Sequence, residues 1–311
     1  MSIKISAVIC TYNQENYLRK AINSLVNQSL SSEEFEIVIV DNASTDNTKK
    51  VVEEFSHVSN IKYVYEPRLG LSYARNTGFK NAVGKYIAYL DDDAVVCPKW
   101  LEYIIKAFES NPGAGCVGGK IAPIWESPRP KWLHDQLLSW LTTLDHGSTP
   151  KFLEDKEWVW GTNMSFLAER LKISGGFRTS LGRKGSLLLS GEEMQLQDNI
   201  RERGYKIYYD PKIEVSHHVH PERLTKEWFF NRFFWQAVTD VEMKKVQPSL
   251  YDGLKELAKF DLASITVHTE DPSKFLQQCR VMRLIGRIVA PFMIKAINDK
   301  IKENNESKNK N

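Results

Sequence analysis

Short apolar runs alternate with amphipathic segments at the start of the chain. Runs rich in isoleucine and valine predict buried strands at residues 4–10, 36–40, 61–65 and 86–90. Between them, apolar residues recur at helical spacing at residues 17–26, 46–55 and 72–82. Asn13 stands where the first helix would be capped, and Ser44 or Asp46 where the second would be. This alternation predicts an α/β fold with a mostly parallel sheet covered by helices.

The pattern changes in the middle of the chain. Four prolines punctuate residues 123–157, and we expect a long insertion or a lid there. The later pattern predicts a strand at 158–166, a glycine-rich loop at 174–190, a helix at 192–203 and short strands at 205–209 and 213–215. Residues beyond 221 are predicted to be mostly helical, and the polar residues 302–311 to be disordered.

Composition and charge exclude several classes of protein. The 42 basic and 39 acidic residues leave a net charge of +3, which is too small for a nucleic-acid-binding protein. No apolar stretch reaches the roughly 18 residues of a membrane-spanning helix, and the N-terminus has the pattern of a strand and not of a signal peptide. The four cysteines lack metal-ligand spacing, so we expect reduced thiols and a cytoplasmic location.

Polar clusters follow three of the predicted strands. Thr11 begins the first cluster, Asp41 the second and Asp91 the third. The carboxyl ends of parallel strands share one edge of a sheet, and ligands of such sheets bind there. The sequence therefore predicts a nucleotide site at this edge.

The third cluster is the triplet Asp91, Asp92 and Asp93. Adjacent carboxylates repel one another, so a bound cation would stabilise them, and oxygen ligands suit Mg²⁺ or Mn²⁺. Alternate residues of an extended segment point to the same side, so Asp91 and Asp93 can share one ion while Asp92 faces away. A solvated acidic turn is the alternative.

Several motifs occur together in a characteristic order. They are SAVICTYNQENYLRKAINSLVNQ, EIVIVDNASTDNT, GLSYARNTGFKNAVGKYIAYLDDD, WGTNMSF, GGF, GEEMQLQDNIRERGYKIYYDP and a histidine pair at 217–218. In these motifs residues 1–220 resemble the family 2 glycosyltransferases, inverting enzymes of bacterial type with the GT-A fold. The resemblance implies a catalytic domain over 1–220, with a nucleotide-binding half at 1–120 and an acceptor half at 121–220. A mostly helical C-terminal extension would follow at 221–311.

The resemblance also assigns roles to single residues. It implies a nucleotide-binding set of Thr11, Tyr12, Asn13, Asp41, Arg75, Asp91 and Asp92. Asp41 would accept a hydrogen bond from the base, which for uracil means its N3–H, because a carboxylate is only an acceptor. The alternatives are a turn aspartate for Asp41 and a surface salt bridge for Arg75.

The catalytic base is implied at the start of the predicted helix at 192–203. The family usually has Glu-Asp there, with the base second, whereas this chain has Glu192 and Glu193. We assign the base to Glu193, with Glu192 as the alternative. Both could instead serve only as acidic residues that stabilise a helix N-terminus.

Metal and acceptor residues complete the expected site. The metal set is Asp91, Asp93 and His217, and His217 is preferred to His218 because adjacent residues of a strand point in opposite directions. A structural histidine is the alternative. The resemblance places Gly161 and Asn163 on the acceptor side, where Trp160 could stack on a sugar, although large aromatic residues are more often core.

Together these residues predict an inverting transferase dependent on Mn²⁺ or Mg²⁺. It would move a sugar from a nucleotide-sugar donor, preferably a UDP-sugar, to a hydroxyl of a glycan or lipid-linked acceptor in polysaccharide or glycoconjugate biosynthesis. A nucleotidyltransferase and an inactive nucleotide-sugar-binding module are the alternatives.

The C-terminal extension has a basic helical face. Arg280, Arg283 and Arg287 fall on one side, next to many apolar residues, and Pro291 should kink the helix. An amphipathic basic helix over 280–302 predicts peripheral contact with the inner face of a membrane. The alternative is a helix packed on the catalytic domain or in a homodimer interface.

Overall fold

The computed structural model describes residues 2–185, 187–246, 255–258 and 269–308. The chain forms two compact units. We call residues 1–126, 139–185 and 192–219 the sheet unit, and residues 127–138, 186–191 and 220–311 the helical unit. Two short segments before residue 220, which we had predicted within the first domain, thus belong to the helical unit.

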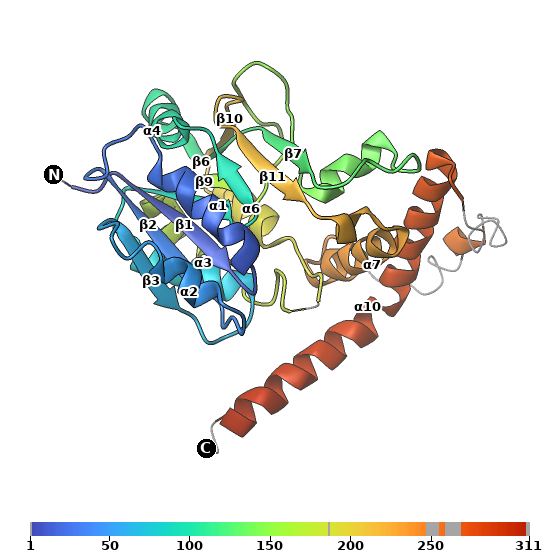
Figure 1. The fold of residues 1–311 in the computed structure, drawn as a ribbon. Coiled ribbons are helices and arrows are strands. Elements are labelled where there is room, and N and C mark those ends of the chain that lie inside the picture. Colours follow the sequence, from blue (N-terminus) through green and yellow to red (C-terminus); the bar gives the residue numbers. More distant parts are fainter. Residues whose placement is uncertain (1, 186, 247–254, 259–268, 309–311) are drawn as a thin grey trace. The chain divides into compact units, whose positions relative to one another are not determined.

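An eight-stranded, mostly parallel sheet forms the centre of the sheet unit, as predicted (Figure 1). Its order is β3 (Ile61–Tyr65), β2 (Phe35–Asp41), β1 (Ile5–Thr11), β4 (Tyr86–Asp91), β9 (Asn163–Leu167), β6 (Ala114–Gly118), β10 (Lys206–Tyr209) and β8 (Lys151–Phe152). Strand β9 runs antiparallel to β4 and β6, and β8 runs antiparallel to β10. The first four predicted strands are confirmed.

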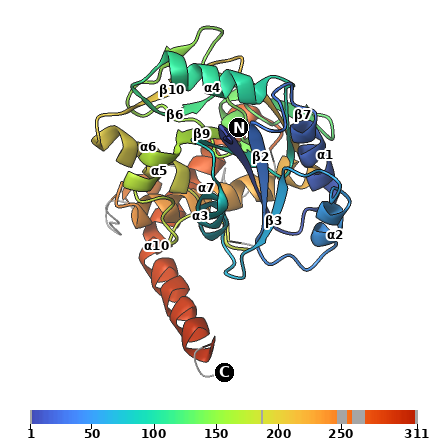
Figure 2. The same ribbon diagram turned by 90° about the vertical axis from the view of Figure 1, so that its left-hand side faces the viewer.

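Helices cover both faces of this sheet (Figure 2). They are α1 (Glu15–Val26), α2 (Thr48–Glu53) and α4 (Trp100–Ser110) on one face, and α3 (Leu71–Asn81), α5 (Ala168–Ile173) and α6 (Glu192–Glu202) on the other. Ile5 and Ile9 of β1 pack in the first apolar cluster, whereas Val8 packs in the second. The strand is therefore mostly apolar because both of its faces are buried.

The first helix begins differently from the prediction, whereas at the second Asp46 Oδ1 accepts from the Thr48 N–H at 3.0 Å. Asn13 does not cap α1; it has a left-handed φ of 53°, and its Oδ1 accepts a hydrogen bond from the Thr45 backbone N–H at 2.8 Å. The Glu15 N–H instead donates to Asp46 Oδ2, and the Asn47 N–H donates to Glu15 Oε2. The carboxylate of Asp46 thus accepts from an N–H at the start of α1, and the carboxylate of Glu15 accepts from an N–H at the start of α2. These bonds satisfy N–H groups that have no partner within their own helix.

A smaller sheet places the end of the sheet unit beside the acidic triplet. It consists of β5 (Ala94–Val96), β11 (Val215–Val219) and β7 (Ile121–Trp125). Strand β11 pairs with β5 in the antiparallel sense and with β7 in the parallel sense. The strand predicted at 213–215 lies slightly later, as β11, whereas β5, β7, β6 and α4 were not predicted from the sequence.

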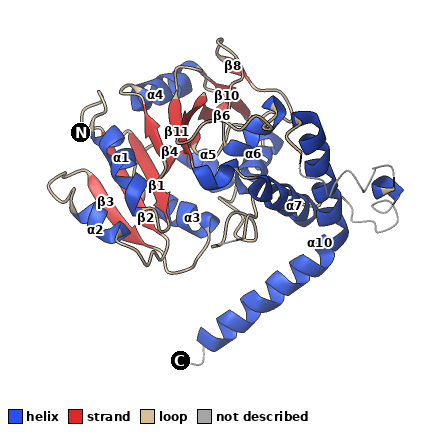
Figure 3. Ribbon diagram, turned by 45° about the vertical axis from the view of Figure 1, so that its right-hand side comes forward, coloured by secondary structure: helices blue, strands red, loops and turns tan. Residues whose placement is uncertain are grey.

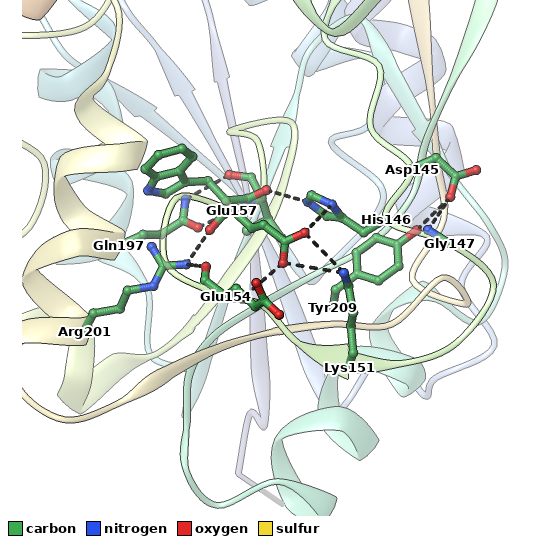
Figure 4. Close-up of polar contacts among 11 residues, drawn as sticks. Asp145, His146, Gly147, Lys151, Glu154, Glu157, Gln197, Arg201 and Tyr209 are labelled. Atoms are coloured by element: carbon green, nitrogen blue, oxygen red, sulfur yellow. Dashed lines mark hydrogen bonds and ion pairs between the residues drawn. The ribbon is translucent and has the colours of Figure 1, made fainter.

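The proline-rich middle segment holds the short helix η1 (Asp135–Leu141) and is tied down beyond it (Figure 4). The Glu157 carboxylate lies 3.2 Å from Lys151 Nζ and 3.6 Å from His146 Nδ1. Arg201 of α6 donates to the backbone carbonyls of Glu154 and Glu157. The part at 145–158 is therefore bound to the sheet unit and does not form a free lid.

The helical unit contains η2 (Pro221–Leu224), α7 (Lys226–Glu242) and α10 (Pro272–Lys308) (Figure 3). Helices α7 and α10 approach closely at Gly286, where a Cβ would lie only 2.6 Å from the Phe234 carbonyl oxygen. Arg283 pairs with Asp240 at 2.6 Å, so part of the predicted basic face packs on α7.

The long helix α10 agrees with one expectation, the kink, and differs from another, the disordered end. Pro291 lies inside it, and the helix bends without ending (Figure 1). It also continues to Lys308, so residues 302–308 are helical where disorder was predicted; residues 309–311 lie outside the described residues. Within the described ranges, we find no helix with both the length and the apolar character needed to span a bilayer.

Candidate active site

Asp91, Asp93 and His217 form a cluster at the carboxyl edge of the sheet. Asp91 ends β4, Asp93 lies in the turn that follows, and His217 lies in β11. One ligand atom from each lies within 4.8 Å of the other two, and His217 Nε2 is 3.2 Å from Asp93 Oδ1. Asp93 and His217 are buried. The structure thus brings together the three residues that the sequence assigned to a metal.

The small sheet explains why these residues meet. His217 is the register partner of Ala94, the residue after Asp93, and the His218 N–H donates to the Asp93 carbonyl oxygen at 2.9 Å. The acidic turn is therefore hydrogen-bonded to the histidine strand through the backbone. His218 lies on the opposite face of β11, where its Nδ1 is 2.8 Å from Glu126 Oε1.

Asp92 does not join the cluster. Burial, followed by the negative charge of Asp93, raises the pKa of Asp92 well above its ordinary value, while the Tyr12 backbone N–H acts in the opposite direction. The side chain is thus directed toward the end of β1, away from Asp91 and Asp93, as alternation along an extended segment requires.

Arg75 of α3 joins the acidic cluster to the start of α6. Its Nη1 lies 2.6 Å from Glu192 Oε1, and its Nη2 lies 3.6 Å from Asp91 Oδ1. The guanidinium is buried and also lies over the Phe177 ring. A Cβ at Gly161 would be 2.3 Å from Nη2, so Gly161 makes room for the guanidinium. Arg75 is therefore a buried bridge and not a surface salt bridge.

Glu192 and Glu193 begin α6 with different surroundings. Glu192 is buried against Arg75, whereas Glu193 is partly exposed. Burial and the charge of Glu193 raise the pKa of Glu192 to about 8, and Arg75 acts in the opposite direction. Glu192 is therefore held in place by Arg75, whereas the Glu193 side chain is partly exposed but keeps its Oε2 buried.

The residues expected at the nucleotide differ in exposure. Thr11 and Asp41 are buried, whereas Tyr12 and Asn13 are exposed. Asp41 Oδ1 accepts from the Ser44 N–H at 2.8 Å, which makes Asp41 a turn aspartate as well. Its Oδ2 accepts from the Tyr63 hydroxyl at 2.7 Å. Each oxygen has a further lone pair with which to accept a ligand N–H.

Comparison with known proteins decides the family. The family model described as "Glycosyl transferase family 2" matches residues 6–168, which carry the acidic triplet and Arg75. The chain belongs to glycosyl transferase family 2. It is accordingly a glycosyltransferase that uses a nucleotide-sugar donor.

Relatives and solved structures agree with this family 2 assignment. The glucosyl-dolichyl phosphate glucuronosyltransferase of Haloferax volcanii is 28% identical over 298 residues, which cover 94% of this chain and 93% of that protein. A mannosyltransferase from Pyrobaculum calidifontis, solved with GDP-Man and Mn²⁺, has a TM-score of 0.58 at 18% identity, covering 96% of this chain and 76% of its own. TarS 1-349 of S. aureus, solved with UDP, has a TM-score of 0.52 at 18% identity, covering 93% and 90%. These neighbours confirm the predicted GT-A fold.

One residue expected on the acceptor side of this family 2 enzyme is part of the core. Asn163 is 0% exposed. Its amide donates to the Lys120 and Ile213 carbonyl oxygens, and its Oδ1 accepts from Trp100 Nε1. The amide oxygen and nitrogen of Asn163 are thus both used to join neighbouring segments, which is a structural role that the sequence analysis did not foresee. Trp160 is half-buried, with its Nε1 3.3 Å from the Thr143 carbonyl oxygen.

Two residues near the cluster were missed by the sequence analysis. The Thr162 hydroxyl donates to Asp91 Oδ2, and Glu126 contacts His218. Thr162 lay within a motif that we had quoted, next to Gly161, and could have been found there. Glu126 follows β7, which was not predicted, and the local sequence carries no signal for its role.

The glycine-rich loop is anchored to α3 over its described part. Ser72 donates to the Leu181 carbonyl oxygen at 2.9 Å, and the Asn76 amide pairs with both backbone groups of Phe177. The Leu71 N–H donates to the Arg183 carbonyl oxygen. The helix that carries Arg75 thus also holds the loop that precedes Glu192.

Proposed function

We propose that the protein is an inverting, divalent-metal-dependent enzyme that transfers a sugar from a UDP-sugar to a hydroxyl of a lipid-linked or glycan acceptor. The observation that carries this proposal is the approach of Asp91, Asp93 and His217 within 4.8 Å of one another. Arg75 lies between this cluster and the two glutamates. One edge of the sheet therefore holds groups for both the departing diphosphate and the attacking hydroxyl.

The chemistry of the cluster fits a divalent cation. Two carboxylates and one imidazole suit Mn²⁺ or Mg²⁺. The nitrogen ligand favours Mn²⁺ of the two, because Mg²⁺ prefers oxygen ligands. The buried carboxylate of Asp93 lies close to the partly exposed carboxylate of Asp91, and such a pair is costly without a cation. When bound, the ion would neutralise negative charge on the diphosphate. Asp91, Asp93 and His217 would hold it, while Arg75 keeps Asp91 in place.

Glu193 is the base in this proposal. Inversion requires one carboxylate that takes the proton from the acceptor hydroxyl as the hydroxyl oxygen attacks the anomeric carbon. Glu192 is engaged by Arg75 at 2.6 Å, whereas Glu193 is partly exposed on the next position of α6. The Glu193 side chain is one methylene longer than the aspartate usual in the family, and it lies in the first turn of α6.

The proposal of a uridine nucleotide rests on Asp41. Its carboxylate can only accept hydrogen bonds, and it retains lone pairs beside Tyr63 and Ser44. We assign the acceptor-only group to the N3–H of uracil, with the exposed Tyr12 beside the nucleoside. One solved neighbour carries GDP-Man and the other carries UDP, so the identity of the nucleobase must be tested directly.

A lipid-linked acceptor is supported by the relative that matches nearly the whole chain. That protein is named a glucosyl-dolichyl phosphate glucuronosyltransferase. A transferase for such an acceptor would work at a membrane surface, and we propose peripheral contact at the cytoplasmic face through the second half of α10. Phe292 is 76% exposed there and lies close in sequence to Lys295. A homodimer interface is the competing use of this helix.

The reaction is tested with a panel of nucleotide sugars, with and without Mn²⁺, by measuring the nucleoside product. We expect metal-dependent release of UDP, with inversion at the anomeric carbon in the product. Release of pyrophosphate would indicate a nucleotidyltransferase. The absence of sugar transfer to any lipid-linked or glycan acceptor would instead indicate an inactive nucleotide-sugar-binding module.

Membrane contact is tested by sedimentation with anionic vesicles at low salt. We expect weak binding that decreases with salt and with Phe292→Ser. The matched control is Val83→Ser, which removes an equally exposed apolar side chain, 69% exposed, from the sheet unit. Changing Arg283 is unsuitable, because it pairs with Asp240 inside the helical unit. Equal binding by both variants would remove α10 from the membrane surface.

A further inference from the structure

Two chemically identical side chains compete for the metal cluster. His217 and His218 are adjacent in β11, and adjacent residues of a strand point to opposite faces. A slip of one residue would exchange them and deliver His218 to Asp93. The backbone N–H and C=O groups of β11 can pair with those of β5 and β7 in either register. Side chains must therefore decide which histidine serves the cluster.

The apolar face of β11 decides only part of this choice. Val215 and Val219 lie on the same face as His217, and all three are buried. The valines favour the observed face because a slip would bury Ser216 in place of an apolar side chain. Val219 holds the last residue of the strand by burial, but neither valine makes a specific contact that distinguishes the two imidazoles.

Glu126 supplies a specific partner for the other histidine. Its Oε1 lies 2.8 Å from His218 Nδ1, and its Oε2 accepts from the Tyr17 hydroxyl of α1 at 2.8 Å. The Tyr17 and His218 rings meet edge to face, with centroids 5.1 Å apart. Glu126 directly follows β7, which is paired with β11 up to Val219. The three side chains thus join β7, β11 and α1 at one point.

We propose that Glu126, held by Tyr17, is a positioning residue that fixes the end of β11 so that His217, and not His218, faces Asp93. This inference rests on the proposed metal role of Asp93 and His217. Glu126 itself would not bind the ion; it holds His218 on the opposite face and thereby sets the place of the His217 imidazole. A positioning residue is needed because the sequence has two adjacent histidines, of which only one can face Asp93.

A second glutamate–histidine pair in the sheet unit provides a matched control. Glu157 lies 3.6 Å from His146, and its carboxylate also contacts Lys151 (Figure 4). This pair fastens the middle segment and contributes no residue to the metal cluster. Its loss should affect stability alone, whereas the loss of Glu126 should affect metal binding.

The experiment measures the affinity for Mn²⁺ in the presence of UDP, by the electron paramagnetic resonance signal of free Mn²⁺. Glu126→Ala should weaken binding about tenfold, since the loss of an orienting partner typically costs roughly 10–100-fold. In a His217→Ala background the same change should cost nothing further, because Glu126 acts through His217. Glu126→Gln keeps one of the two contacts and should fall between the wild type and the alanine variant.

Melting temperatures separate positioning from general damage. Glu157→Ala should lower the melting temperature and leave Mn²⁺ affinity unchanged. Equal losses of affinity for Glu126→Ala in the wild-type and His217→Ala backgrounds would overturn the inference, and so would unchanged affinity in the wild type. Failure of the wild type itself to bind Mn²⁺ with UDP would overturn the proposed function first, and this inference with it.

Discussion

Glu66 and Glu192 are both buried and both pair with an arginine, yet their environments shift their pKa values in opposite directions. The Arg68 guanidinium lowers the pKa of Glu66 to about 2, with further donors from Thr77 and the Arg68 backbone. Burial and Glu193 raise the pKa of Glu192 to about 8, although Arg75 lies 2.6 Å away. One carboxylate is surrounded by donors, and the other shares its donor with further carboxylates.

This contrast separates structural carboxylates from those of the site. Glu66 is complete in the folded protein: it ties the segment after β3 to α3 and has no need of a ligand. At the sheet edge, in contrast, Asp91 and Glu192 share Arg75, and Asp92 and Asp93 lie next to each other. Carboxylates held this close together favour the binding of a cation or of a proton.

The largest effect should come from Glu193→Gln. The amide keeps the shape of the side chain but cannot take a proton, so kcat should fall by about 10²–10⁴-fold. Binding of UDP with Mn²⁺ should remain unchanged, because Glu193 is not assigned to the donor. Transfer rates at saturating donor, together with calorimetry of UDP binding, check both statements.

Glu192→Gln is the matched control for this prediction. The amide oxygen can still accept a hydrogen bond from Arg75, so kcat should stay within about tenfold of the wild type. If Glu192→Gln is the variant that loses transfer and Glu193→Gln is not, the two roles are reversed.

The metal-free protein should lose stability as pH rises from about 4.5 to about 8. In this range the unfolded chain releases the Glu192 proton, while the folded chain retains it because its pKa is raised to about 8. The contribution should reach at most about 5 kcal/mol. Urea unfolding at several pH values should show this slope, and Glu192→Gln should flatten it. An unchanged slope in that variant would mean that Arg75 keeps Glu192 ionised.

Glu66 should have the opposite and smaller effect. Its lowered pKa stabilises the fold above about pH 4.5, and this stabilisation is lost as pH falls toward 2. The contribution should be at most about 3 kcal/mol. Glu66→Gln should therefore lower the unfolding free energy at pH 7 and make it less dependent on acid. Similar acid profiles for the variant and the wild type would contradict this reading.

The sequence predicts the regions in which one pattern dominates. Long apolar runs identify β1, β2, β3 and β4, and alternation within the triplet after β4 predicts that Asp91 and Asp93 lie together, as they do. Elements shorter than the pattern window, such as the three-residue β5, give no signal of their own. Their existence depends on pairing with β11, more than 100 residues away in the chain.

The contacts that the sequence did not reveal at the site have the same origin. Asn163 lies in one of the quoted motifs, but its amide is used by three segments that meet only in the folded chain. Glu126 is one glutamate in a proline-rich stretch, and its contact with His218 spans 92 positions. The local sequence indicates which polar residues gather at this edge of the sheet. The side chains that orient these residues belong to distant segments.

Calorimetry of UDP binding with and without Mn²⁺, for the wild type and Asp93→Ala, tests the central claim most directly. The wild type should bind UDP at least about 100-fold more tightly with Mn²⁺, and Asp93→Ala should lose this difference, because the buried carboxylate beside His217 is the ligand on which the cluster depends. Metal-dependent binding that is the same in Asp93→Ala would place the ion elsewhere and contradict the account.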